Sequence, residues 1–167
     1  KLLLVVGARP NFMKIAPLVR AFAKRRGMIS YKIVHTQQHN DYRMTDIFIK
    51  QLMIPQPHYF LGAAGKTGIA QMAHCMLRFE RVCLQERPDY VVVVGDVNST
   101  LAAAITAKRL GFKVAHIEAG LRSYDPDMPE EVNRVVTDSV TDVFFVTERS
   151  ALRNLLSEGK ERSAISL

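Results

Sequence analysis

The chain has 167 residues, of which 48% are hydrophobic and 23% charged, and its formal net charge is +7. The length suits one domain with its own core, and no apolar run approaches the roughly 18 residues of a membrane span, so we expect a soluble globular protein without a membrane partner. The basic residues are scattered, and their densest cluster, at 24–26, lies where a helix should end, so the charge favours a phosphate-bearing small ligand over nucleic acid.

Short apolar runs alternate with amphipathic stretches along the chain. Strands are predicted at 2–6, 31–35, 90–94, 113–117 and 143–146, and helices at about 12–26, 43–52, 67–86, 98–110, 130–140 and 148–158. Four consecutive valines at 91–94 are typical of a strand that is buried on both faces, as in a parallel sheet covered by helices. The alternation predicts an α/β fold with a Rossmann-like, doubly wound parallel sheet.

The two cysteines do not suggest a disulfide or a metal site. Cys75 and Cys83 fall in the predicted helix at 67–86, about 12 Å apart along its axis, which is too far for a disulfide. With no Cys-x-x-Cys motif, no zinc site is indicated, and free thiols suit the reducing cytoplasm.

Polar side chains follow each of the first four predicted strands, in the loops 7–11, 36–39, 95–100 and 118–122. Open α/β sheets bind their ligands beyond the carboxyl ends of the strands. We therefore expect these four loops to converge on one crevice.

Two acidic residues in this crevice are candidates for catalysis. Asp96 ends an apolar strand and opens a helix, where Asn98 and Ser99 are equally good caps, so a role beyond capping is favoured. Glu118 directly follows a buried strand, and a carboxylate there needs a partner or a function. The structural alternative for Glu118 is an ion pair with Arg122.

A third acid and three basic residues complete the candidate site. Glu130 follows Pro129 at a predicted helix start, where an acid also favours the helix dipole, and Arg134 lies one turn further on. Together with the other two acids, Glu130 could pass protons if the environments separate their pKa values. Arg9 and Lys14 flank the first turn and helix, whose N-terminus attracts phosphate, so they indicate a diphosphate site, with a solvated Lys14 as the alternative.

Two familiar nucleotide motifs are absent from the sequence. No G-x-G-x-x-G follows the first strand, so a nicotinamide or flavin cofactor is unsupported. The segment 62–67, Gly-Ala-Ala-Gly-Lys-Thr, has two residues between its first glycine and Gly-Lys where a P-loop has four. A P-loop ATPase is therefore disfavoured. Among the histidines, His39 follows two glutamines in a loop and is a ligand candidate.

Five segments, in order over nearly the whole chain, resemble the non-hydrolysing UDP-N-acetylglucosamine 2-epimerases. They are Gly-Ala-Arg-Pro-Asn-Phe-Met-Lys-Ile-Ala-Pro-Leu at 7–18, Gln-His at 38–39, Gly-Asp at 95–96, His-Ile-Glu-Ala-Gly-Leu-Arg at 116–122 and Pro-Glu-Glu-Val-Asn-Arg at 129–134. The resemblance implies one half of a GT-B-type two-domain fold, with the active site in the cleft between the domains. Residues 1–167 would be the single N-terminal Rossmann-like domain, and the second, C-terminal domain would be absent from this chain.

The resemblance also assigns roles to residues. The matches are Asp96, Glu118 and Glu130 to the family's catalytic acids, Arg9, Lys14 and Arg134 to positions that bind the nucleotide diphosphate, and Gln38 and His39 to a region tied in some bacterial members to an allosteric substrate site. The family's catalytic histidine belongs to the second domain. The first turn departs from the family pattern, because it reads Gly-Ala-Arg-Pro-Asn where many members have Gly-Thr-Arg-Pro-Glu, which leaves the exact sugar nucleotide open.

The implied function is that of an isomerase. It would interconvert UDP-N-acetylglucosamine and UDP-N-acetylmannosamine by elimination and re-addition of UDP, with no metal and no cofactor. The resemblance further implies a cytoplasmic homodimer that serves polysaccharide biosynthesis. The alternatives are a GT-B-type glycosyltransferase that uses a UDP-sugar, or a non-catalytic nucleotide-binding domain, and we expect the isolated chain to be inactive.

Overall fold

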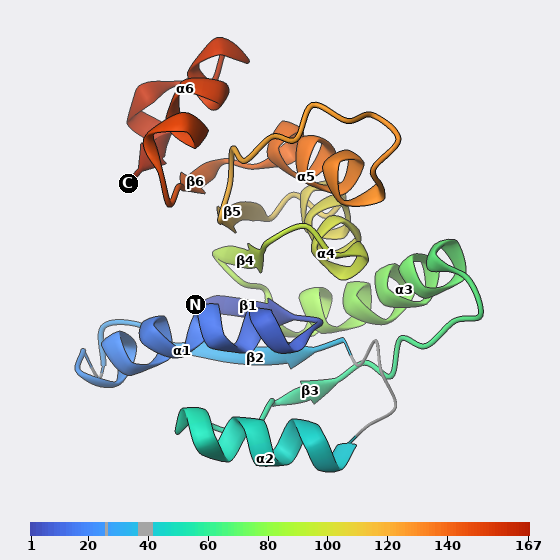
Figure 1. Ribbon diagram of the computed structural model, residues 1–167. Helices are drawn as coiled ribbons and strands as arrows, with labels where there is room; N and C mark the ends of the chain where they lie inside the picture. The colour runs from blue at the N-terminus through green and yellow to red at the C-terminus, as the bar shows by residue number, and fades with distance from the viewer. Residues whose placement is uncertain (26, 37–41) are drawn as a thin grey trace.

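The computed structural model describes residues 1–25, 27–36 and 42–167, without the side chains of 42–46. Within these residues a seven-stranded, wholly parallel sheet has the strand order β3-β2-β1-β4-β5-β6-β7 (Figure 1). The elements are β1 (Leu2–Val6), α1 (Arg9–Ala23), β2 (Tyr31–His35), α2 (Tyr42–Leu52), β3 (Tyr59–Phe60), α3 (Gly68–Glu86), β4 (Tyr90–Val94), α4 (Asn98–Arg109), β5 (Lys113–Ile117), α5 (Pro129–Val140), β6 (Val143–Phe145), α6 (Arg149–Ser157), the 3-10 helix η1 (Arg162–Ala164) and β7 (Ile165–Ser166).

The predicted doubly wound α/β fold is confirmed, and each predicted strand and helix is present. The largest shift is at α1, which begins at Arg9 rather than 12 because Pro10 occupies its first turn, where a fixed φ favours the helix. The strands β3 and β7 were not predicted. Each has only two residues, too few to show a hydrophobic period.

The strand order creates a crevice at the centre of the sheet. The chain starts with β1 in the middle, builds outward through β2 and β3, and then returns through α3 to place β4 on the other side of β1. The connections after β1 and β4 therefore leave in opposite directions. Such a topological switch point is where open α/β sheets bind ligands.

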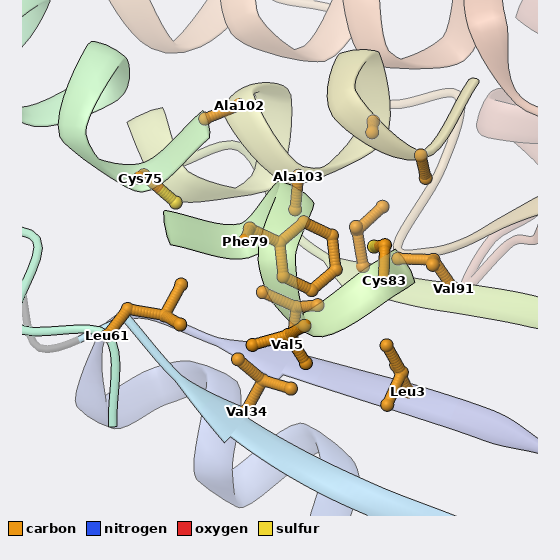
Figure 2. Close-up of a cluster of buried hydrophobic side chains, with 14 of the residues drawn as sticks. Leu3, Val5, Val34, Leu61, Cys75, Phe79, Cys83, Val91, Ala102 and Ala103 are labelled. Atoms are coloured by element: carbon orange, nitrogen blue, oxygen red, sulfur yellow. The ribbon is translucent and has the colours of Figure 1, made fainter. Parts of the chain in front are cut away.

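The core lies on both faces of the sheet, because successive strand side chains point to opposite sides. On one face Leu3 and Val5 pack with Phe79 and Cys83 of α3 and with the alanines of α4 (Figure 2). On the other face Leu4 and Val6 pack with side chains of α1 and α2. The small residues of α4 let it lie close to the sheet while α3 and α5 flank it.

Both cysteines are core residues rather than ligands or disulfide partners. Cys75 is 1% exposed and Cys83 is fully buried, and both thiols are free. Burial raises the pKa of each thiol to about 12, so neither is a thiolate at neutral pH.

The sheet face that α1 covers extends over β4, β5 and β6. In the described part of the chain, no helix covers it there (Figure 1). An apolar groove of about 560 Å³ runs there, and Phe145 on its floor is 43% exposed. None of the described helices is both long and apolar enough to cross a membrane.

Candidate functional site

The ends of β1, β4 and β5 meet at the switch point, as the sequence predicts for three of the four loops; the fourth, 36–39, lies outside the described residues apart from Thr36. Gly95, the residue after β4, has a left-handed φ of +69° and lies against side chains from both neighbouring connections. A Cβ atom on Gly95 would be 3.4 Å from Glu118 Oε2 and 3.6 Å from both Asn11 Nδ2 and Lys14 Nζ. Three segments distant in sequence thus converge on one point.

Asn11 holds the first turn rather than facing a ligand. Its Oδ1 accepts hydrogen bonds from the backbone N–H groups of Gly7, at 3.1 Å, and Ala8, at 2.9 Å. Its Nδ2 donates to Val94 O at 3.1 Å, and Asn11 is only 3% exposed. The asparagine that departs from the family pattern therefore ties the turn after β1 to the end of β4.

Lys14, on α1, forms an ion pair with Glu118, which directly follows β5. Both side chains are partly exposed, at 34% and 26%, so the pair lies at the edge of the crevice. The structural alternative of a Glu118–Arg122 ion pair is wrong, and Lys14 is partly solvated but paired with Glu118. Arg122 is bound by other carboxylates, because β5 places it beyond the sheet beside α5 and α6.

Glu118 has a left-handed backbone, with a φ of +70°. A non-glycine residue in this region costs roughly 1 to 3 kcal/mol, and such strain persists where the surrounding structure imposes it, often at functional sites. The N–H groups of Glu118 and Ala119 both donate to Phe145 O, at 2.9 and 3.1 Å. The conformation of Glu118 is therefore held from the neighbouring strand β6.

Asp96 forms the second ion pair of the site. Its Oδ2 lies 2.5 Å from Arg134 Nη2, and Asn133 Nδ2 donates to its backbone oxygen at 2.9 Å. The N-cap residue of α4 is Val97, whose side chain makes no capping hydrogen bond. Asp96, Asn98 and Ser99 are thus not the caps that the sequence offered as an alternative.

The two glutamates at the start of α5 have different environments. Glu130 is exposed in the first turn, where its charge favours the helix dipole, and it takes part in no ion pair among the described residues. Glu131 is buried, accepts hydrogen bonds from the N–H groups of Ser123 and Tyr124 at 3.0 and 3.1 Å, and forms an ion pair with Arg134. Burial raises the pKa of Glu131, but these N–H groups and Arg134 outweigh it and lower the pKa. Glu131, which the sequence analysis missed, orients Arg134.

The remaining predicted ligand residues lie at the same edge or outside the described residues. Arg9 is the first residue of α1 and is exposed. Gln38 and His39 lie outside the described residues. His35, just before them, packs edge-on against Phe12 with ring centroids 5.1 Å apart, and burial lowers its pKa to about 4.

A buried network that the sequence analysis missed lies behind the two predicted acids. His116 Nδ1 is 2.7 Å from Asp138 Oδ1, and His116 Nε2 is 2.8 Å from Gly95 O. Arg122 donates to Asp138 at 2.8 Å and to both carboxylate oxygens of Glu158 at 2.7 and 2.6 Å. Burial raises the pKa of Asp138, but His116 and Arg122 outweigh it and lower the pKa. An acid near the C-terminus of a helix opposes the helix dipole and therefore needs a partner. The position of Asp138 in the last turn of α5 was the sequence signal that could have indicated this network.

A polar pocket of about 430 Å³ opens beside Arg134. Its lining comes from the loop after β5, from α5 and from the start of α6. The lining residues are Leu121, Arg122, Ser123, Tyr124, Arg134, Glu148, Ser150 and Asn154. The described residues contain no group of three or more His, Cys, Asp or Glu side chains that could hold a metal ion. The site therefore presents cations and carboxylates beside an open polar space.

The model of the UDP-N-acetylglucosamine 2-epimerase family matches residues 21–167. The chain belongs to this family. It is 45% identical, over all 167 residues, to the UDP-2,3-diacetamido-2,3-dideoxy-D-glucuronate 2-epimerase of Pseudomonas aeruginosa, and covers 47% of that protein. It is 43% identical, over 99% of its length, to the UDP-N-acetylglucosamine 2-epimerase of Methanocaldococcus jannaschii, of which it covers 44%.

Comparison with solved structures agrees with this family assignment. The crystal structure of the M. jannaschii UDP-GlcNAc 2-epimerase in complex with UDP-GlcNAc and UDP superposes with a TM-score of 0.94 and 42% identity, over 99% of this chain and 45% of that one. The sheet is thus the Rossmann-like part of the GT-B-type fold of these epimerases. The chain spans less than half the length of these relatives.

Proposed function

We propose that this chain supplies one wall of the active site of a UDP-sugar 2-epimerase, which interconverts UDP-N-acetylglucosamine and UDP-N-acetylmannosamine. The supporting observation is that Glu118 and Asp96 each bind a cation, Lys14 and Arg134, at the carboxyl ends of neighbouring strands. Carboxylates can move protons and cations can hold a diphosphate, so each pair combines the two functions that the reaction requires.

The chemistry follows from the position of the epimerised carbon. The hydrogen at C2 of the sugar has no adjacent carbonyl, so simple enolisation cannot remove it. In the proposed route UDP leaves C1 while C2 loses its proton, which gives a glycal, and UDP then returns to C1 as C2 is protonated from the other face. Every bond that breaks is formed again, so the reaction is redox-neutral and needs no redox cofactor.

The side chains divide between these tasks. Asp96, Glu118 and Glu130 would transfer protons and stabilise positive charge at C1, while Arg9, Lys14 and Arg134 would bind the diphosphate. A diphosphate that binds Lys14 or Arg134 competes with their present carboxylate partners. Departing UDP would therefore meet cations that are already in place and ordered.

Residues outside this chain complete the proposed site. Because the chain spans less than half of its relatives, we propose that it is the N-terminal domain and that a second domain forms the other wall of the cleft. On this proposal the isolated chain has little turnover. We also propose that Gln38 and His39, which come soon after β2 in the sequence, contact a sugar nucleotide at an allosteric site.

We also propose that the protein is a cytoplasmic homodimer in polysaccharide biosynthesis. Two free buried thiols are consistent with a reducing compartment. Ile69, Leu77 and Leu84 are 77%, 62% and 56% exposed on one face of α3, and exposed apolar surface of this kind favours self-association. Light scattering of the full-length protein tests the assembly, and a monomer would contradict it.

Proton NMR in D2O tests the proposed activity. The full-length protein is incubated with UDP-N-acetylglucosamine and no acceptor, and the signal of C2–H is followed. We expect inversion at C2 with uptake of deuterium and no lasting free sugar. Free N-acetylmannosamine would indicate a hydrolysing enzyme, and an unchanged sugar would favour a glycosyltransferase or another sugar nucleotide.

A second substrate is favoured by one comparison. The P. aeruginosa relative, at 45% identity, is named for UDP-2,3-diacetamido-2,3-dideoxy-D-glucuronate. The same NMR measurement with that sugar nucleotide decides between the two substrates, because the ratio of the two kcat/KM values reports the difference in transition-state binding.

A further inference from the structure

One buried carboxylate holds the chain on both sides of Glu118. Oδ1 of Asp138 lies 2.7 Å from the ring of His116, two residues before Glu118, and Oδ2 accepts from the N–H of Gly120, two residues after it, at 3.0 Å. Asp138 is fully buried, so water does not compete for either bond. The strained backbone of Glu118 is therefore fixed from two sides by a residue of α5.

His116 extends this network to the other predicted acid. Its Nε2 lies 2.8 Å from the carbonyl oxygen of Gly95, the residue directly before Asp96. The carbonyl oxygen of Gly95 can only accept, so Nε2 of His116 is the donor in this bond. A single fully buried side chain thus connects the turn that carries Asp96 to the residues that flank Glu118.

We propose that His116 is a positioning residue for the proposed epimerase reaction. Its Nε2–H fixes the Gly95–Asp96 turn and so sets the position of Asp96 relative to Glu118. His116 touches no solvent and cannot touch the substrate. Its effect is on geometry, and misplacement of a reacting group by 1 Å can cost about a hundredfold in rate. This inference rests on the proposed function, in which both acids act on the same sugar.

A purely structural role of His116 would depend on Nδ1, which faces Asp138, and not on Nε2, which faces Gly95. If His116 served only to anchor α5, the bond from Nδ1 to Asp138 would matter and the bond to Gly95 would not. The two bonds can be separated by substitution. The amide of asparagine is attached to Cγ, as Nδ1 is, and the amide of glutamine lies one bond further out, as Nε2 does. His116→Asn can therefore keep the contact with Asp138, and His116→Gln the contact with Gly95.

The experiment compares these two variants in the full-length protein. Each loses one buried hydrogen bond, so we expect similar decreases in Tm. We expect kcat of His116→Asn to be roughly tenfold below that of His116→Gln, with KM for the UDP-sugar nearly unchanged in both. Equal kcat values, a lower kcat for His116→Gln, or a change confined to KM would overturn the proposal. His74→Gln, an exposed histidine of α3, is the control and should leave kcat and KM unchanged.

A second measurement does not depend on turnover. In amide NMR spectra of the full-length protein, His116→Asn should shift the resonances of Gly95 and Asp96, and His116→Gln should shift them much less. Equal shifts in the two variants would overturn the positioning role even if the protein proved to have another substrate. Failure of the proposed function itself would appear separately, as a wild-type protein that leaves both UDP-sugars unchanged.

Discussion

The guanidinium of Arg134 lies 2.5 Å from the carboxylate of Asp96, although 38 residues separate them in the sequence. A second nitrogen of the same guanidinium binds the buried Glu131. Because the guanidinium is a rigid planar fork, contact with Glu131 also sets the direction in which Arg134 meets Asp96. The pair is therefore ordered before any ligand arrives.

Replacement of Arg134 by lysine should weaken the binding of UDP. A lysine keeps the charge, but its single ammonium group cannot hold two carboxylates in the geometry of a fork. We expect the Kd of the full-length protein for UDP, measured by calorimetry, to rise roughly tenfold, which corresponds to about 1.4 kcal/mol. Arg81→Lys on the exposed side of α3 is the control. An unchanged Kd for Arg134→Lys would remove Arg134 from the diphosphate site.

Glu118→Gln should reduce epimerase turnover of the full-length protein by at least about a hundredfold, because an amide cannot accept the proton. Stability should change little, since the lost ion pair with Lys14 is partly exposed and such pairs contribute about 1 kcal/mol or less. Turnover is measured by NMR and Tm by circular dichroism. Glu80→Gln on α3 is the matched control, and normal turnover of Glu118→Gln would show that Glu118 is not a catalytic acid.

Two glycines with the same backbone conformation should differ in their tolerance of alanine. Gly120 and Gly111 have φ values of +78° and +82°, but a Cβ on Gly120 would lie 2.5 Å from Ala151 O, while a Cβ on Gly111 meets nothing within 4 Å. Gly111→Ala should cost about 1 to 2 kcal/mol for the left-handed conformation alone. Gly120→Ala should cost clearly more, because α6 must move. Urea unfolding measures both, and equal costs would contradict the packing argument.

Glu86 should make stability depend on pH in the acid range. Lys1, Lys32 and Tyr59 donate hydrogen bonds to its carboxylate and lower its pKa from 4.5 to about 2. The folded protein favours the ionised form of Glu86, so the carboxylate increases the free energy of unfolding. This contribution of Glu86 is complete above pH 4.5, falls as the pH drops, and is lost below about pH 2. The difference in unfolding free energy between wild type and Glu86→Gln should therefore shrink from pH 6 to pH 2. A constant difference would show that Glu86 is not held as predicted.

The fold was predictable because burial on both faces leaves a strong local signal. Strands such as β4, with its run of valines, can be recognised in isolation, and the helices between them show their own period. The short strand β3 could not be predicted in this way, since its two residues gain their conformation from pairing with β2. Local sequence therefore determines the elements that carry a pattern, and the tertiary structure determines the rest.

The location of the site was predictable, but the partners within it were not. The rule that ligands bind at strand ends places Asp96 and Glu118 at one edge. The partner of Glu118 depends instead on which strands are neighbours, because Lys14 reaches it from α1 only where β1 lies beside β4. The nearby Arg122, the obvious partner in sequence, is turned toward Asp138.

The Lys14–Glu118 ion pair can form only late in the synthesis of this chain. Its two members are 104 residues apart, so at roughly 5 to 20 residues per second the ribosome adds the second about 5 to 20 s after the first. Until residues 90–94 are made, β1 has β2 beside it but has no β4, and its other edge stays open. This first part of the nascent chain is where we expect chaperone contact, and its need for protection should end once β4 and β5 have emerged.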